Sequence, residues 1–199
     1  MKQIIETLRA QRDLSDAELI ALITRDSDDS DLFAAADAVR RERYGTDVFL
    51  RGLIEFTNVC QNDCYYCGIR KSNPHADRYR LTQDQILQSC ANGYEMGFRT
   101  FVLQGGEDPR NTDAWVCSVV DKIKTAYPDC AVTLSIGEQS RASYQAYFDA
   151  GADRYLLRHE TASDAHYRKL HPEEMSLEHR KRCLFDLKDI GYQVGAGFM

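Results

Sequence analysis

The sequence contains no long apolar run and no excess of positive charge. No stretch of its 199 residues approaches the 18 or more apolar residues that a membrane-spanning helix needs. Its opening residues include Glu6 and other charges, where a secretory signal would have an uninterrupted apolar segment. The formal net charge of −6 argues against a nucleic-acid-binding surface, which would need a basic face. We therefore expect a cytoplasmic protein that binds neither a membrane nor nucleic acid.

A second group of closely spaced cysteines is also missing. A structural zinc site usually takes its four ligands from two pairs, whereas this chain has a single triplet, Cys60, Cys64 and Cys67. The other cysteines are spread through predicted helices and strands, as buried cysteines often are: Cys90, Cys117, Cys130 and Cys183. An odd total of 7 without a secretory signal also argues against a disulfide framework.

The triplet has the spacing C-x3-C-x2-C and directly follows the apolar run of residues 50–56. Three thiolates on one short loop can bind three irons of a cubic iron–sulfur cluster, which leaves the fourth iron open to a small molecule. We predict that Cys60, Cys64 and Cys67 are ligands of such a cluster. One alternative is a zinc site, which would indicate a zinc-binding oxidoreductase domain. The other is that the three cysteines are purely structural.

Short apolar runs alternate with amphipathic stretches from residue 50 onward. Strands are expected at 51–57, 100–104, 131–135, 153–157 and 192–198, and helices at 82–97, 111–126, 140–150 and 176–190. Such alternation predicts parallel β/α units. A complete (β/α)8 TIM-type barrel takes roughly 250 residues, so we expect the N-terminal part of a barrel that is truncated in its fifth strand. An open half-barrel is the alternative.

Helices are expected to precede this fold. The first 45 residues read as helical, with a break at the acidic segment 25–31 and a helix end near Gly45. Capping boxes are predicted at Ser15 and Thr82, each with Glu or Gln three residues later. We therefore divide the chain into a helical N-terminal extension, residues 1–48, and a β/α core, residues 49–199.

Polar residues follow several of the predicted strands directly. Gly105, Gly106 and Glu107 follow the second strand, and Ser135 ends the third. Arg158 lies just beyond the fourth strand. Because the carboxyl ends of barrel strands share one face, where active sites lie, these residues and the cysteine triplet are predicted to share a site.

Other polar residues have ordinary explanations. Glu160 could form a structural ion pair with Arg158, and the basic helical segment around Arg180 could be a solvated face. Four histidines show no metal-ligand spacing and are expected at the surface or in polar networks: His159, His166, His171 and His179.

The triplet with Tyr66 before its last cysteine, followed by Gly-Gly-Glu after the next strand, resembles the radical S-adenosylmethionine (SAM) superfamily. Segments 55–60, 64–70, 78–80, 103–108 and 153–161 resemble, more closely, the HydE-type FeFe-hydrogenase maturation enzymes. These enzymes are related to biotin synthase and methylornithine synthase. The resemblance covers the chain from about residue 30 and implies a radical SAM barrel.

The resemblance also implies a role for each matching residue. Three positions would bind a 4Fe-4S cluster whose open iron takes SAM, and they are Cys60, Cys64 and Cys67. SAM contacts are implied for Gly105, Gly106, Glu107, Glu160, Arg180 and Met199. Substrate contacts are implied for Ser135 and Arg158.

The implied activity is reductive cleavage of SAM to a 5′-deoxyadenosyl radical, in maturation of the FeFe-hydrogenase cofactor, the H-cluster. A small-molecule or organometallic substrate, a low-potential electron donor of the ferredoxin or flavodoxin type, and other hydrogenase maturation proteins are the implied partners. Alternatives are a biotin synthase-like or methylornithine synthase-like enzyme, or a catalytically incomplete cluster-binding fragment.

Overall fold

The chain divides into two units, Met1–Phe49 and Leu50–Met199, and the first consists of helices. The computed structural model describes residues 1–26 and 28–199. The first unit contains α1 (Lys2–Gln11), α2 (Asp16–Ile23) and α3 (Ser30–Tyr44). The predicted capping box at Ser15 begins α2. The predicted break at 25–31 includes residue 27, which lies outside the described residues.

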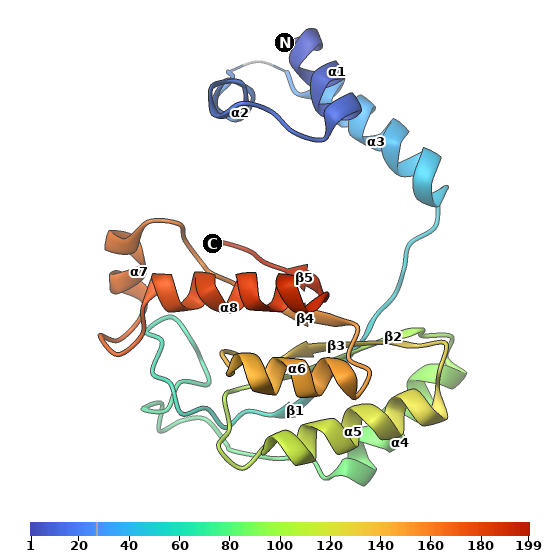
Figure 1. Ribbon diagram of the computed structural model, residues 1–199, viewed down its shortest axis with the longest axis vertical. Helices are drawn as coiled ribbons and strands as arrows, with labels where there is room; N and C mark the ends of the chain where they lie inside the picture. The colour runs from blue at the N-terminus through green and yellow to red at the C-terminus, as the bar shows by residue number, and fades with distance from the viewer. Residues whose placement is uncertain (27) are drawn as a thin grey trace. The chain divides into compact units, whose positions relative to one another are not determined.

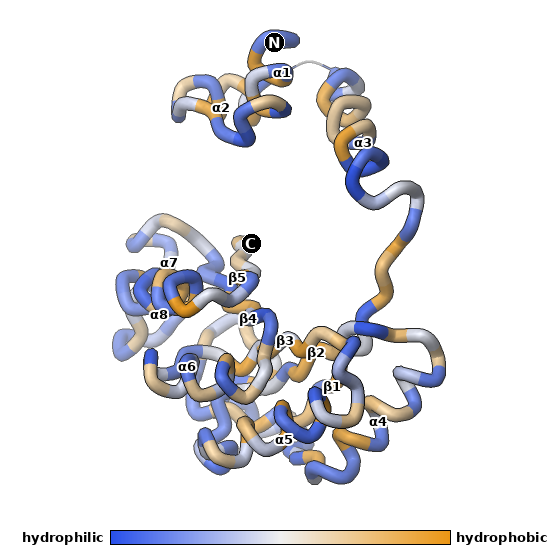
Figure 2. The backbone as a smooth tube through the Cα atoms, turned by 45° about the vertical axis from the view of Figure 1, so that its right-hand side comes forward, coloured by the Kyte–Doolittle hydropathy of each residue, from blue (hydrophilic) through white to orange (hydrophobic). Residues whose placement is uncertain are grey.

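Apolar residues mark the boundary between the units. Figure 2 shows this stretch in orange between α3 and β1. Val48, Phe49 and Leu50 are all strongly exposed. The boundary therefore differs from the polar composition typical of linkers.

The second unit is built on a five-stranded parallel sheet (Figure 1). Its strands are β1 (Gly52–Thr57), β2 (Thr100–Gly105), β3 (Ala131–Ser135), β4 (Arg154–Leu156) and β5 (Gln193–Gly195). They pair in the order β1-β2-β3-β4-β5, so each strand lies next to its sequence neighbour. This is the strand order of a β/α barrel, in which all carboxyl ends face the same way. The predicted α/β fold is confirmed.

Four helices pack side by side along one face of this sheet (Figure 1). They are α4 (Gln83–Glu95), α5 (Asp113–Ala126), α6 (Arg141–Asp149) and α8 (Leu177–Ile190). A further helix, α7 (Asp164–Leu170), lies between β4 and α8. The four predicted intervening helices are confirmed, and α7 is an additional helix that the sequence did not predict. The seven-residue α7 buries only Tyr167, so it has no apolar stripe that could reveal a helix.

Hydroxyl side chains fix where most of these helices begin. In all five helices of the second unit, as in α2, the residue before the first turn is Ser or Thr, and its hydroxyl accepts the backbone N–H three residues on. Each such cap contributes about 1 kcal/mol. The starts of the helices therefore fix where the loops at the sheet's carboxyl edge end.

The fifth strand is shorter than the expected 192–198. The chain beyond β5 instead runs beside the segment that follows β4. The backbone N–H groups of His159 and Glu160 both donate to the Gly197 carbonyl at 3.0 Å, and Met199 N donates to the Glu160 carbonyl at 3.0 Å. These bonds hold the segment after β4 in place.

The core lies between the sheet and its helices. Its largest fully buried side chains include Tyr144, Tyr147, Tyr155 and Phe101. Tyr155 donates to the Gly137 carbonyl at 2.8 Å, so its hydroxyl is satisfied at the sheet's carboxyl edge. Across residues 1–26 and 28–199, no helix is both long enough and apolar enough to cross a membrane.

Candidate active site

The three cysteines of the triplet lie on one loop, residues 58–81, which connects β1 to α4 and is called here the cysteine loop. All three are free thiols and half-buried. Backbone hydrogen bonds attach the loop to its surroundings: Gln61 N donates to the Glu107 carbonyl and Tyr65 N to the Leu170 carbonyl, both at 2.9 Å. The loop is therefore anchored to the segment after β2 and to the end of α7.

The two ends of the cysteine loop meet at Asp108, whose side chain is fully buried. Thr57, before the loop, donates its hydroxyl to Oδ2 at 3.0 Å. Arg80, at the far end, donates from Nε to Oδ2 at 2.5 Å and from Nη2 to Oδ1 at 3.0 Å. Burial opposes ionisation, but the hydrogen bonds from Arg80, from the Arg110 backbone and from Thr57 hold the pKa of Asp108 below its ordinary value. Sequence reasoning missed this clamp.

A second arginine crosses the middle of the cysteine loop. Arg78 donates from Nη1 to the carbonyls of Asn58 and Ile69, and from Nη2 to the carbonyl of Arg70 at 2.7 Å. One planar guanidinium thus satisfies carbonyls from separate parts of the loop. These contacts therefore help to fix the loop's shape on both sides of the triplet.

Gly106 allows the segment after β2 to touch the first cysteine of the triplet. A Cβ at this position would overlap the Val59 carbonyl oxygen and lie 2.7 Å from the Cys60 Cβ. Any side chain here would push the two segments apart. The predicted glycine is thus needed for close approach.

Glu107 is buried and held in one orientation beside Gly106. Its Oε1 accepts the backbone N–H of Glu138 at 2.8 Å. Gly137 has a φ of +77°, and a Cβ there would fall on the Glu107 side chain. The loops after β2 and β3 therefore fit together around this carboxylate.

A cavity of about 290 Å³ opens at the carboxyl ends of the strands. Five of the predicted site residues line it: Gly105, Ser135, Arg158, Glu160 and Arg180. Gln104 also lines it, and the sheet register places this residue beside Ser135. The cysteines, Gly106, Glu107 and Met199 are not among its lining residues. The structure thus brings the polar strand-end residues together next to the cysteine loop.

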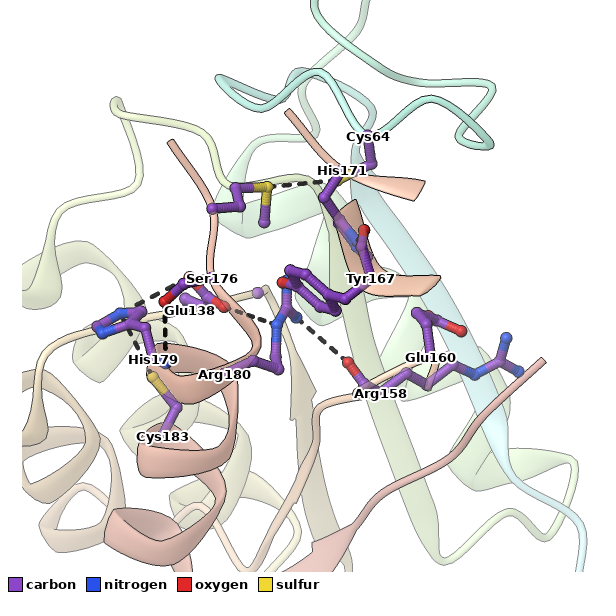
Figure 3. Close-up of polar contacts among 12 residues, drawn as sticks. Cys64, Glu138, Arg158, Glu160, Tyr167, His171, Ser176, His179, Arg180 and Cys183 are labelled. Carbon is purple, nitrogen blue, oxygen red and sulfur yellow. Dashed lines mark hydrogen bonds and ion pairs between the residues drawn. The ribbon is translucent and has the colours of Figure 1, made fainter. Parts of the chain in front are cut away.

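Arg180 is buried at this cavity and forms an ion pair with Glu138, with 2.6 Å between Nε and Oε1 (Figure 3). The two atoms are close but not aligned as a regular hydrogen bond. Burial lowers the pKa of Arg180, but the charge of Glu138, the nearby Tyr167 and the charge of Glu107 together outweigh burial and raise that pKa above its ordinary value. Burial also raises the pKa of Glu138, against the opposing charge of Arg180. The solvated helix face considered for Arg180 is therefore wrong.

Glu160 is a buried carboxylate in an unusual backbone conformation. Its φ is +64°, which is strained for a residue with a side chain. Its Oε2 is buried and has no hydrogen-bond partner among residues 1–26 and 28–199. Within the same residues, the ion pair considered between Glu160 and Arg158 does not form. A buried oxygen without a partner beside a polar cavity is what a ligand would satisfy.

Met199 contacts this segment through its backbone. Its N–H bonds the Glu160 carbonyl, as described above, while its side chain is largely exposed. The structure therefore places Met199 next to Glu160, outside the lining of the cavity.

The donor set of the cysteine loop fits an iron–sulfur cluster. Nowhere in residues 1–26 and 28–199 do three His, Cys, Asp or Glu side chains gather closely enough to hold one metal ion. A cubic cluster makes a different demand, because each thiolate binds its own iron. Three free thiols on one loop, with the glycine-permitted contact at Cys60 beside them, meet that demand.

Comparison with known proteins gives a consistent result. A family model described as the Radical SAM superfamily matches residues 54–199. The chain is 46% identical over 168 residues to the [FeFe] hydrogenase maturase subunit HydE of Thermotoga maritima. The aligned residues make up 84% of this chain and 47% of that protein. It is 29% identical over 191 residues to the 3-methylornithine synthase of Methanosarcina acetivorans, 94% of this chain and 53% of that protein.

A solved structure agrees in fold. The crystal structure of methylornithine synthase (PylB) superposes with a TM-score of 0.85 at 28% identity, covering 98% of this chain and 58% of that one. The chain spans about half the length of the curated relatives that it matches.

Proposed function

The chain belongs to the radical SAM superfamily, and on that basis we propose that Cys60, Cys64 and Cys67 hold a 4Fe-4S cluster that binds SAM. When bound, these groups supply a 5′-deoxyadenosyl radical by reductive cleavage of SAM. One observation carries the proposal above the others. The three thiols share a loop that is clamped by Asp108 and lies next to a polar cavity at the strand ends.

The charges around the cavity suit the methionyl part of SAM, which carries an amino group and a carboxylate. Glu160 offers a buried oxygen without a partner to a cation. Arg180 uses its Nε for Glu138, and its Nη1 donates to the Arg158 carbonyl at 3.4 Å, so its Nη2 is the nitrogen that a carboxylate would meet first. We assign SAM contacts to Gly105, Gly106, Glu107, Glu160, Arg180 and Met199.

Substrate contacts are assigned to Ser135 and Arg158. Ser135 lines the cavity from the end of β3, and Arg158 lines it from the segment just after β4, the neighbouring strand. Gln104 joins them as a neutral hydrogen-bonding group beside Ser135. In the proposed reaction these residues orient the substrate, because placing a reactive group beside its target is the protein's main task in cofactor chemistry.

The finer proposal is a role in FeFe-hydrogenase cofactor maturation. It is supported by 46% identity to the HydE relative over 84% of this chain. An organometallic substrate, a low-potential ferredoxin or flavodoxin and other hydrogenase maturation proteins would then be partners, in the cytoplasm. A methylornithine synthase-like activity is the second candidate, favoured by the TM-score of 0.85 to that enzyme's structure.

The proposal is tested by reducing the protein anaerobically in the presence of SAM, after reconstitution with iron and sulfide. We expect methionine and 5′-deoxyadenosine to appear in equal amounts, measured by liquid chromatography. Glu160→Gln should lower the rate at low SAM concentrations, whereas the exposed control Glu173→Gln should not. If the wild-type protein has a full cluster and still forms no 5′-deoxyadenosine, the proposed activity is wrong.

A further inference from the structure

We propose that His171 is a positioning residue that accepts the hydroxyl proton of Tyr66 and so leaves the Glu160 carboxylate available to a ligand. The inference rests on the proposed function, because it concerns how Glu160 is prepared for SAM. Sequence reasoning gave His171 no role beyond the surface or a polar network. The structure instead buries it beside the candidate site, with 2% of its surface exposed.

His171 lies directly after α7 and is fixed by two aromatic rings. It stacks on Tyr167, with ring centroids 3.8 Å apart and planes 15° apart. The Tyr66 ring meets it edge-on at 5.5 Å. Figure 3 shows His171 and Tyr167 in the same site as Glu160 and Arg180. With stacking on one face and an edge contact, the imidazole has little freedom to turn.

The hydrogen bonds of His171 determine which ring nitrogen carries the proton. Nδ1 lies 3.1 Å from the backbone carbonyl oxygen of Tyr167, which can only accept. Nδ1 must therefore be the donor, and in the neutral ring Nε2 is then an acceptor. Burial lowers the pKa of His171, which favours this neutral form. An acceptor nitrogen thus faces the Tyr66 hydroxyl.

The Tyr66 hydroxyl lies between two acceptors but has one proton to give. It is 3.5 Å from His171 Nε2 and 3.4 Å from Glu160 Oε1. Both contacts are long for hydrogen bonds, so a small movement of the ring decides between them. If the proton goes to His171, both carboxylate oxygens of Glu160 are left for a ligand. If His171 cannot accept, Tyr66 occupies Oε1 and competes with that ligand.

The same segment is attached to the cysteine loop. Tyr66 lies between two predicted cluster ligands, and its neighbour Tyr65 donates its backbone N–H to the Leu170 carbonyl, one residue before His171. Met175 Sδ lies 3.7 Å from Cys64 Sγ. Residues 170–175 are therefore in direct contact with the cysteine loop, and His171 is well placed to set the position of Tyr66 relative to it.

The experiment measures SAM affinity by calorimetry on the reconstituted full chain, with thermal unfolding recorded for each variant. His171→Phe keeps an aromatic ring on Tyr167 but removes the acceptor, and should weaken SAM binding about threefold to tenfold, the effect of one hydrogen bond. The exposed control His166→Phe should bind SAM as the wild type does. Equal affinity of His171→Phe and the wild type would overturn the inference.

A double-mutant cycle separates positioning from simple packing. In a Tyr66→Phe background, His171→Phe should cause no further loss of SAM affinity, because the hydroxyl through which His171 acts is gone. An equal loss in both backgrounds would overturn the inference. His171→Gln, whose amide oxygen can replace Nε2, should bind SAM more tightly than His171→Asn, and the opposite order would also contradict it.

The proposed function can fail separately. A wild-type protein that carries a full cluster but does not bind SAM would overturn the proposed function, before any variant is compared. If the wild-type protein binds SAM, but the losses of SAM affinity from Tyr66→Phe and His171→Phe simply add, only the role of His171 is overturned. If His171→Phe does not fold, the comparison of SAM affinity between His171→Gln and His171→Asn still tests the role of His171.

Discussion

The cysteine loop and the core beneath the sheet both contain cysteines, in different surroundings. In the core, Cys90, Cys130 and Cys183 are buried, and burial raises the pKa of Cys90 to about 12. In the loop, burial also raises the pKa of Cys64, to about 11, but the cysteines there are only half-buried and lie within a network of backbone hydrogen bonds. Buried thiols in apolar surroundings are inert, whereas accessible ones can bind metal. The fold, rather than the number of cysteines, therefore decides which thiols can do chemistry.

The largest expected effect comes from changing a loop cysteine. Cys64→Ser should lose nearly all cluster, because two thiolates do not hold a cubic cluster against loss of iron. Iron and sulfide analysis after reconstitution measures this. Cys117→Ser, on α5, is the control and should keep the wild-type content. If Cys64→Ser kept the wild-type content of iron and sulfide, the proposed difference between loop and core cysteines would be contradicted.

The next effect concerns the buried ion pair at the cavity. Side-chain exposure is 9% for Arg180 and 13% for Glu138, so Arg180→Met leaves a buried carboxylate with only the exposed His179, 3.7 Å away, beside it. The free energy of unfolding in urea should fall by about 3–5 kcal/mol. Arg182→Met, two residues on in the same helix and 69% exposed, should change it by less than about 1 kcal/mol. Similar losses in the two variants would show that Arg180 is not part of a buried pair.

Replacing a core cysteine should lower the stability of the protein but leave its cluster content unchanged, the opposite of what we expect for Cys64→Ser. Cys90→Ser places a hydroxyl in a fully buried apolar site and should cost about 1–3 kcal/mol of stability. The iron content should stay at the wild-type level. Urea unfolding and metal analysis of the same sample test both parts. Loss of the cluster with unchanged stability would contradict the structural role of Cys90.

The smallest effect is a change in pH dependence at the clamp of the cysteine loop. The pKa of Asp108 is held below 3.8, because the hydrogen bonds from Arg80, the Arg110 backbone and Thr57 outweigh the opposing effect of burial. Its contribution to stability is therefore present above that value and is lost as pH falls through the lowered pKa. Unfolding free energies measured from neutral pH downward should fall less steeply in Asp108→Asn.

Asp121→Asn, on the exposed side of α5, serves as the control for this measurement. It should keep the wild-type slope in the acid range. A slope for Asp108→Asn equal to that of the wild type would mean that the clamp does not depend on the charge of Asp108.

The sequence predicted the sheet well because its strands are short apolar runs that alternate with capped helices. Thr82 and Ser15 begin helices as expected, and the strand order follows the chain. It did not reveal α7, whose apolar contact is confined to Tyr167. It also overestimated β5, because the residues beyond Gly195 pair with the segment around Glu160 only locally.

At the site, local motifs were predictable and long-range pairs were not. The triplet, Gly106 and Glu107 follow from spacing and from their position after a strand. The pairing of Arg180 with Glu138 depends on the approach of α8 to the loop after β3, and the clamp at Asp108 on the two ends of a long loop meeting. No local pattern encodes such distances. His171 was missed for the same reason.

The central claim is that the cysteine loop holds a cluster whose open iron binds SAM. Electron paramagnetic resonance of the reduced, reconstituted protein tests it most directly. The account predicts the signal of a reduced 4Fe-4S cluster, and a change in that signal when SAM is added. A missing cluster signal, or a cluster signal that SAM leaves unchanged, would contradict it.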